Sequence, residues 1–294
     1  MCGILFYKQK EEINTENATK LKKQLSLISH RGPDNIVDQI LHNKYFGFTR
    51  LCINGLDNSG NQPFIINNVV LICNGEIYNY QNLLNENKFD YKSNSDCEII
   101  IHMYLKYGIE ETVKCLDGVF SFVLYDITND LLFAARDPIG IRPLFISNQN
   151  DSIWLASELK AIKTIHSIEQ FKPGHYYDFN NNKYIKYFDD LYILNNISYN
   201  DNKVVIRGLL TESVQKRLLS DRPVASLLSG GLDSTIITAL VAKNYEPYKL
   251  NTYSIGMKGS VDLTYANIAA KYIKTNHTTI ELSEKEFLDA IEET

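Results

Sequence analysis

Short apolar runs bounded by turn residues dominate residues 1–190 of this 294-residue chain. Runs of this length and composition are typical of β-strands. The strands predicted in this way cover residues 4–7, 69–73, 119–125, 131–135 and 153–156. Many strands interrupted by few helices predict stacked β-sheets with helices packed on them.

Two helical patterns interrupt these strands. In the first, Leu21, Leu25 and Ile28 fall on one helix face. The second begins at Ser95, with Glu98 three residues later in the spacing of a capping box, and is predicted to end before Gly108.

The pattern changes after a polar stretch at residues 195–202. Strands are predicted at 224–228, 248–255 and 277–282, and helices at 204–219, 232–243, 263–274 and from Ser283. This alternating order predicts a doubly wound parallel sheet in a second domain, residues 203–294. About 90 residues are few for such a sheet, so we expect the second domain to be incomplete.

The composition mainly argues against certain classes of protein, namely nucleic-acid-binding, membrane-spanning and secreted proteins. The formal net charge is −5 and no basic block is present, so a nucleic-acid surface is not expected. No apolar run approaches the roughly 18 residues of a membrane span, and the start of the chain lacks the pattern of a signal peptide. These features predict a cytoplasmic protein that does not bind membranes.

Four of the five cysteines, Cys52, Cys73, Cys97 and Cys115, lack metal-ligand spacing, and the odd total argues against a disulfide framework. We predict reduced core residues. The six histidines lie outside metal-binding patterns, so a structural metal is not expected.

Cys2 stands directly behind the initiator methionine. Removal of Met1 would make Cys2 both a thiol nucleophile and the free amino terminus. An α-amino group has a pKa of about 7.7–8 and a thiol about 8.5, so the amine can accept the thiol proton near neutral pH. The alternative is that a cysteine falls at this position by chance.

A glycine-containing loop follows the predicted strand at 224–228 and opens the next helix. Its residues are Ser229, Gly230, Gly231, Leu232, Asp233 and Ser234. Two glycines and a helix N-terminus suit a phosphate or pyrophosphate, although an ordinary strand-to-helix turn could have the same residues. The Walker spacing and its lysine are absent. Asp233 is a candidate Mg²⁺ ligand or a helix cap.

Polar residues of the first domain could bind an amino acid. Asn74 and Gly75 directly follow the run 69–73 and could donate hydrogen bonds to an oxyanion. Arg50 and Asp96 could hold the carboxylate and the ammonium of a zwitterion. From the residues alone, the favoured interpretation is surface charge or, for Asp96, a charge at a helix N-terminus.

Taken together, these motifs occur in a specific order. They are Cys2-Gly3-Ile4, His30-Arg31-Gly32-Pro33-Asp34, Arg50-Leu51, Gln62-Pro63, Asn74-Gly75-Glu76-Ile77-Tyr78-Asn79, Ser95-Asp96-Cys97-Glu98, Arg136-Asp137-Pro138-Ile139-Gly140, Ser157-Glu158 and the loop 229–234. The ordered set, which spans nearly the whole chain, resembles glutamine-hydrolysing asparagine synthetase, a class II glutamine amidotransferase joined to an ATP-pyrophosphatase-type domain.

The resemblance implies an αββα N-terminal nucleophile (Ntn) hydrolase-like fold for residues 1–190. Cys2 would attack the glutamine amide, with Asn74 and Gly75 stabilising the oxyanion. The glutamine-binding set would be Arg50, Leu51, Cys52, Ile53, Asn54, Asn74, Gly75, Glu76 and Asp96. The segment after Arg50 reads LCIN, whereas relatives have a more apolar stretch ending in Asp, so we expect it to act through its backbone.

For residues 203–294 the resemblance implies the use of ATP. Leu227, the loop 229–234 and Ile255 would contact the nucleotide, and Mg²⁺ would offset its phosphate charge. ATP would activate aspartate as an acyl-adenylate, which ammonia from glutamine converts to asparagine. The family's further nucleotide and aspartate motifs lie downstream of the residues present here. Its members often dimerise through the glutaminase domain.

Other functions fit the same residues. One is a stand-alone glutaminase; another is an ATP-dependent amide-forming enzyme with a different carboxylate, as in the β-lactam-forming relatives. Glutaminase domains of the latter often lack the nucleophile, so Cys2 argues against them. A third is a module that binds glutamine, or a partner synthetase, without turnover.

Overall fold

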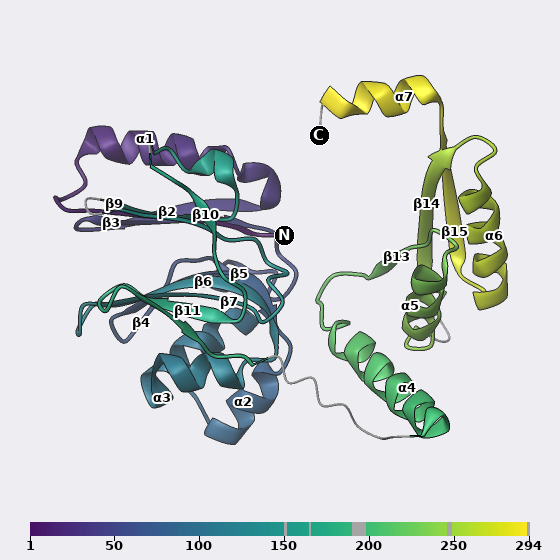
Figure 1. Cartoon of the computed structure of the whole chain (residues 1–294), viewed down its shortest axis with the longest axis horizontal. Helices are drawn as coiled ribbons and strands as arrows, with labels where there is room; N and C mark the ends of the chain where they lie inside the picture. The colour runs from purple at the N-terminus through teal and green to yellow at the C-terminus, as the bar shows by residue number, and fades with distance from the viewer. Residues whose placement is uncertain (150–151, 165, 190–197, 246–248, 293–294) are drawn as a thin grey trace. The chain divides into compact units, whose positions relative to one another are not determined.

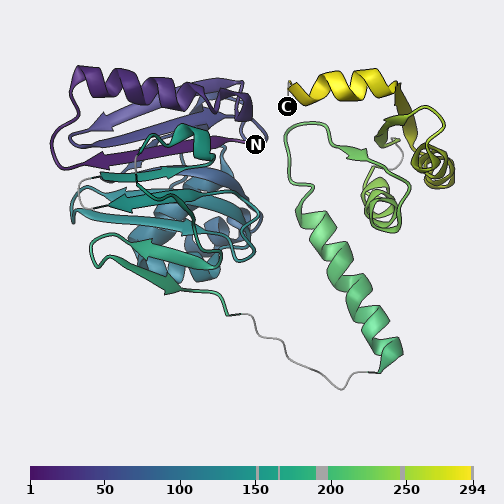
Figure 2. The same ribbon diagram turned by 45° about the horizontal axis from the view of Figure 1, so that its top comes forward.

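A computed structural model describes residues 1–149, 152–164, 166–189, 198–245 and 249–292. The chain divides into two compact units, Met1–Ile193 and Leu194–Thr294. Figures 1 and 2 show the elements of each unit, which are described separately.

Two six-stranded antiparallel sheets form the first unit. In order across the first sheet, the strands are β10 (Glu169–Gln170), β8 (Phe145–Gln149), β9 (Ser152–Ala156), β1 (Gly3–Gln9), β3 (Lys44–Arg50) and β2 (Asn35–Leu41). In the second sheet they are β12 (Lys183–Lys186), β11 (His175–Asp178), β7 (Leu131–Arg136), β6 (Gly118–Asp126), β5 (Val69–Ile77) and β4 (Phe64–Ile66).

The two sheets pack face to face, with a helical layer on each outer side (Figure 1). Apolar side chains of both sheets, among them Phe6, Phe46 and Ile72, form one buried cluster between them. Helix α1 (Thr15–Ser26) covers the first sheet, and α2 (Tyr80–Asn87) and α3 (Ile99–Cys115) cover the second. Short 3-10 helices are η1 (Ser29–Arg31), η2 (Asn58–Gly60), η3 (Asp96–Glu98) and η4 (Leu159–Ala161).

The helix predicted from Ser95 differs from the observed one. Ser95 caps η3 by accepting a hydrogen bond from the backbone N–H of Cys97, and α3 begins only at Ile99. The Glu98 carboxylate accepts from the backbone N–H groups of Lys92 and Ser93, so the predicted capping box does not form. Gly108, at φ 76°, interrupts the helix, but helical residues continue to Cys115.

In the second unit, β13 (Ala225–Leu227), β14 (Asn251–Met257) and β15 (Asn276–Leu282) form a parallel sheet. The helices are α4 (Tyr199–Lys216), α5 (Leu232–Ala242), α6 (Val261–Ile273), α7 (Glu284–Asp289) and the 3-10 helix η5 (Ala290–Glu292). The predicted alternation of strands and helices is therefore present, although residue 248 of the second predicted strand lies outside the described residues.

Both crossover helices of this sheet pack on one of its faces. Ser226 of β13 bonds to Thr238 of α5, and Leu228, on the same face, packs against Ala266 of α6. Side chains that alternate to the opposite face, such as Ile255, are exposed. The predicted parallel strand order is observed. A doubly wound sheet also has helices on both faces, whereas within the described residues the crossover helices cover one face.

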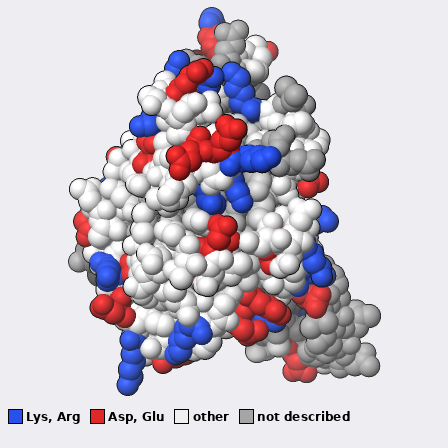
Figure 3. All heavy atoms as spheres, turned by 90° about the vertical axis from the view of Figure 1, so that its left-hand side faces the viewer, with Lys and Arg blue, Asp and Glu red and all other residues white. Residues whose placement is uncertain are grey.

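Several surface features also bear on the sequence-based expectations. Cys115 is exposed, which corrects its prediction as a core residue, whereas Cys52, Cys73 and Cys97 are buried. Basic and acidic side chains are interspersed on the face that Figure 3 shows. Within the described residues, no helix combines the length and the apolar character needed to cross a membrane.

Candidate active site

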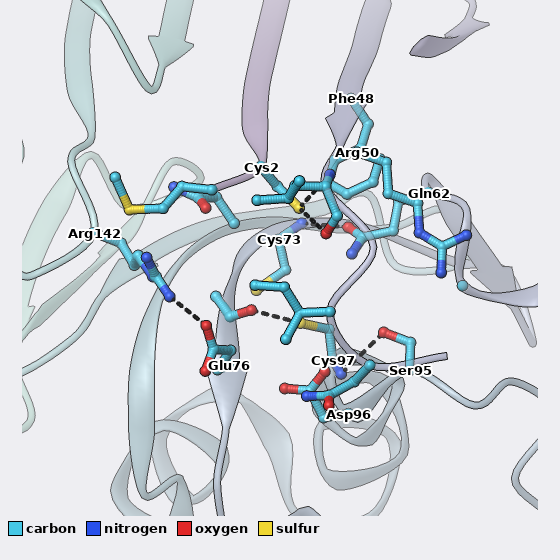
Figure 4. A pocket seen from close by; sticks show the side chains of 17 residues that line it. Cys2, Phe48, Arg50, Gln62, Cys73, Glu76, Ser95, Asp96, Cys97 and Arg142 are labelled. Carbon is cyan, nitrogen blue, oxygen red and sulfur yellow. Dashed lines mark hydrogen bonds and ion pairs between the residues drawn. The ribbon is translucent and has the colours of Figure 1, made fainter. Parts of the chain in front are cut away.

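A pocket in the first unit collects most of the predicted glutaminase residues (Figure 4). Its lining comes from the start of β1, the end of β3, the middle of β5 and the 3-10 helix η3. The lining residues include Cys2, Arg50, Leu51, Ile53, Asn54, Asn74, Gly75, Glu76 and Asp96. Cys52 is buried beside them, and its backbone N–H donates to Asp34.

Cys2 lies immediately before β1, between the neighbouring strands β3 and β9. Its thiol donates to the backbone carbonyl of Leu51 at 3.6 Å and accepts from the Leu51 N–H at 3.4 Å. The Arg31 Nε donates a hydrogen bond to the Cys2 carbonyl oxygen at 2.9 Å. Burial raises the pKa of the Cys2 thiol, which favours its protonated form.

Burial also lowers the pKa of the terminal amino group, here on Met1, which favours a neutral amine able to accept a proton. The charges of Arg31 and Arg142 lower this pKa further, whereas those of Cys2 and Glu76 raise it. The amine of Met1 and the thiol of Cys2 thus lie close enough at the start of β1 to influence each other's charge.

Asn74 and Gly75 lie within β5, which continues to Ile77, and not beyond the strand end as predicted. The Asn74 side chain is 1 % exposed, and its amide nitrogen Nδ2 has no hydrogen-bond partner among the described residues. A Cβ at position 75 would lie 2.7 Å from the carbonyl oxygen of Val119, so only glycine fits there. An unsatisfied buried donor is costly unless a ligand supplies its acceptor.

Arg50 is buried, which rules out the surface-charge explanation. Its Nη1 donates to the carbonyl of Asp57 at 2.5 Å and to the Asn61 side chain at 2.8 Å, and its Nη2 donates to the carbonyl of Gly55. These acceptors are neutral oxygens. They orient the guanidinium.

Asp96 is equally buried and faces the same pocket (Figure 4). Its carboxylate accepts from the backbone N–H of Ile77 at 2.6 Å and from the Asn54 side chain. Burial, with the nearby Glu76 charge, raises the pKa of Asp96 to about 6, against the lowering effect of these hydrogen bonds. The expectation that this segment acts through its backbone thus holds for Leu51, which bonds to the Cys2 thiol, but Asn54 bonds to Asp96 through its side chain.

Sequence reasoning missed several residues of the pocket. Arg142 forms an ion pair with Glu76, with 2.8 Å between Nη2 and Oε1. The others are Met1, Phe48, Gly60, Gln62, Cys73, Ser95 and Cys97. Of these, Gln62 accepts from the backbone N–H of Cys73 at 2.6 Å, and the Cys97 thiol donates to the carbonyl of Gly75 at 3.6 Å. Only the Gln-Pro and Ser-Asp-Cys motifs pointed towards any of them.

The loop at residues 229–234 lies in the second unit, between β13 and α5. Gly230 adopts φ 80°, and a Cβ there would lie 2.3 Å from the backbone nitrogen of Ala266. The hydroxyls of Ser229 and Ser234 bond to each other at 2.9 Å. Asp233 is exposed in the first turn of α5, and Leu227 and Ile255 line a pocket beside the loop.

Comparison with known proteins identifies the family to which this chain belongs. A family model described as a glutamine amidotransferase domain matches residues 1–171, more than half of the chain. The chain belongs to the glutamine amidotransferase family. A second model, described as asparagine synthase, matches residues 205–294.

Relatives with known names support the same assignment. A probable asparagine synthetase (glutamine-hydrolysing) of Schizosaccharomyces pombe is 37 % identical over 99 % of this chain, and one of Dictyostelium discoideum 35 % over 99 %. The asparagine synthetase of Zea mays is 35 % identical over 100 % of this chain. These matches confirm the resemblance found in the motifs. The chain spans 57 %, 57 % and 52 % of these relatives, in that order.

Solved structures show the fold alone. A glutamine phosphoribosylpyrophosphate amidotransferase from B. subtilis, complexed with ADP and GMP, matches with a TM-score of 0.53 and 17 % identity. The match covers 98 % of this chain and 70 % of that protein.

Proposed function

We propose that this chain carries out the glutamine-hydrolysing step of asparagine synthesis. In this reaction glutamine yields glutamate and ammonia, and ammonia amidates an aspartyl-adenylate formed from aspartate and ATP, with release of AMP and pyrophosphate. The names of the relatives and the two matched family models support the reaction.

One observation carries the glutaminase proposal. A buried amide donor of Asn74 without a partner faces the pocket that also contains the Cys2 thiol. Attack of a thiolate on a carboxamide creates an oxyanion, and a preorganised donor stabilises such a charge. The neighbouring Gly75 N–H would be the second donor.

The proposed mechanism begins with removal of Met1, which lines the pocket. The free amine of Cys2 takes the thiol proton, and Sγ adds to the glutamine side-chain carbonyl. Collapse of the tetrahedral intermediate breaks the C–N bond, and the proton leaves with ammonia. Water then hydrolyses the thioester to glutamate and restores the thiol. The entire Ntn-type sequence uses one residue as nucleophile and base.

Charged residues of the pocket suit the two charged groups on the α-carbon of glutamine. Arg50 would bind the α-carboxylate, since its own partners are neutral oxygens. Glu76 on β5 and Asp96 on η3 would bind the α-ammonium. The backbone from Leu51 to Asn54 would close the remaining wall.

In the second unit, ATP is the proposed ligand of Leu227, Ile255 and the loop 229–234. A helix N-terminus and a glycine-rich turn suit its phosphates. Within the described residues no cluster of three acidic, histidine or cysteine side chains could hold a metal. Mg²⁺ therefore fits only with phosphate oxygens as most of its ligands and Asp233 as a single carboxylate, where it would offset phosphate charge.

A single labelling experiment tests both halves. Protein whose intact mass shows loss of Met1 is incubated with amide-¹⁵N glutamine, aspartate, ATP and Mg²⁺, and the products are identified by mass spectrometry. We expect glutamate and labelled ammonia, both lost in Cys2→Ala. Labelled asparagine would show that these 294 residues also activate aspartate; without it, the chain acts as a glutaminase. Undiminished hydrolysis in Cys2→Ala would refute the nucleophile assignment, and no product at all would favour a binding module.

A cytoplasmic location and dimerisation through the glutaminase domain stay predictions. Sedimentation of the purified chain tests the second.

A further inference from the structure

The loop between β7 and β8 brings a second cation to the glutaminase pocket. The loop starts after Arg136, the last residue of β7, includes the rest of the Arg136–Gly140 motif and continues through Arg142. The Arg142 side chain lines the pocket and points to Glu76 on β5 (Figure 4). These two residues are 66 positions apart in the sequence.

The Arg142–Glu76 ion pair is largely buried, and some of its hydrogen-bonding atoms have no partner. The side chains are 10 % and 20 % exposed, and their Nη2–Oε1 distance is 2.8 Å. Within the described residues, Glu76 Oε2 accepts no hydrogen bond, and the buried Nε of Arg142 has no partner. One carboxylate oxygen is thus fixed, while the other is left for a ligand.

The backbone of the loop is anchored without the Arg142 guanidinium. The Asp137 carboxylate accepts from the backbone N–H groups of residues 139–142, and Arg136 Nε donates to the Arg142 carbonyl at 2.7 Å. The fold of the loop therefore does not require the Arg142 side chain. Its conformation, however, delivers that side chain to the pocket.

Glu76 needs such a partner because a second carboxylate, Asp96, lines the same pocket. Like charges repel, and an unpaired Glu76 side chain would turn towards solvent. The planar guanidinium fixes the orientation of the carboxylate.

We propose that Arg142 is a positioning residue for the α-ammonium of glutamine: it holds the Glu76 carboxylate in the pocket so that Oε2 meets the ammonium. This inference rests on the proposed glutaminase function and deepens it. Arg142 itself need not touch the substrate.

Steady-state hydrolysis by Arg142→Met and Arg142→Lys, with loss of Met1 checked by mass, tests the role. We expect Arg142→Met to raise KM for glutamine about 10- to 100-fold, the range of a charge-assisted hydrogen bond, with a smaller change in kcat. Arg142→Lys should recover part of the loss. Arg207→Met in the exposed part of α4 is the matched control and should leave both constants unchanged.

A substrate analogue separates positioning from a general structural role. Glutaramate is glutamine without its α-amino group, so Glu76 has nothing to bind in it. Arg142→Met should leave kcat/KM for glutaramate, or its inhibition constant where turnover is slow, within about two-fold of the wild-type value. In a Glu76→Gln background, Arg142→Met should likewise add little.

The outcomes are distinct. Equal losses for glutamine and glutaramate, or no loss for either, overturn the role of Arg142 while leaving the glutaminase intact. A wild-type chain without hydrolysis overturns the proposed function itself. Should Arg142→Met fail to fold, as judged by circular dichroism, Arg142→Lys and Glu76→Gln decide by the same ratio of glutamine to glutaramate.

Discussion

The residues of the glutaminase pocket and those of the loop 229–234 are held in different ways. Cys2 and Asp96 form hydrogen bonds with groups 49 and 19 positions away, whereas the Arg50 guanidinium donates to the nearby loop 55–61; Arg50 and Asp96 are buried. The loop in the second unit is largely exposed, and the hydroxyls of Ser229 and Ser234 bond to each other. Function in the first unit should therefore depend on single side-chain atoms, and in the second on backbone conformation.

Asn74→Ala is the most severe test of the first half of this comparison. Loss of one oxyanion donor should reduce kcat for glutamine hydrolysis by about 10²–10³ and leave KM nearly unchanged, because the oxyanion forms only during reaction. Release of ¹⁵N ammonia measures both constants. Asn181→Ala, at an exposed turn, is the control. A loss confined to KM would mean that Asn74 binds the ground state and is no oxyanion donor.

The pH dependence of glutamine binding tests Asp96. Its pKa of about 6 means that the carboxyl becomes neutral as the pH falls below 6 and no longer attracts the ammonium. KM should therefore rise on acidification through pH 6. Asp96→Asn should have a KM about 10- to 100-fold higher at pH 8 and no such transition. Parallel pH profiles for the two proteins would exclude Asp96 as the titrating group.

The same residue also affects stability. The folded-state pKa of about 6 lies above the unfolded value near 4, so the folded state holds the proton more tightly between these limits. Relative to Asp96→Asn, the wild type should lose roughly 2 kcal/mol of stability as the pH rises from 4 to 6, and only a few tenths more above pH 6. Urea titrations at several pH values measure this difference.

Gly230 tests the second half of the comparison. Alanine at φ 80° costs about 1–3 kcal/mol, and its Cβ would also meet the backbone of α6. Gly230→Ala should therefore speed amide hydrogen exchange in α5 and α6 without changing glutamine hydrolysis. Gly231→Ala is the matched control, because the nearest atom to its Cβ would be the Ser229 hydroxyl at 3.5 Å. Equal exchange in both variants would contradict a conformational requirement at 230.

Sequence patterns predicted several of the well-buried strands but missed β3, which is buried throughout, because Lys44, Thr49 and Arg50 interrupt its apolar run. Strands β5, β6 and β7 coincide with apolar runs because both of their faces are covered. They did not predict β2 or β12, whose residues alternate between half-buried and exposed and include several polar side chains. Neither strand has a pattern distinct from a loop, and their pairing depends on partners remote in sequence.

The site divides in the same way. Cys2 and the Asn74-Gly75 pair could be predicted because their chemistry follows from their position next to the terminus or to a strand run. Arg142 could not, because its partner Glu76 lies 66 residues away. Nor could the burial of Arg50, since only the folded loop 55–61 supplies its acceptors.

The smallest predicted effect compares one substitution in the two units. Ile72 is fully buried between the sheets, whereas Ile255 is 58 % exposed on β14. Removing one methyl group from a packed core costs about 0.5–1.5 kcal/mol, so Ile72→Val should destabilise the first unit by that amount. Ile255→Val should change the stability of the second unit by less than about 0.5 kcal/mol. Amide hydrogen exchange, followed separately for β5 and β14, measures the change in stability of each unit. A cost at Ile255 equal to that at Ile72 would mean that the apolar face of β14 is covered in solution.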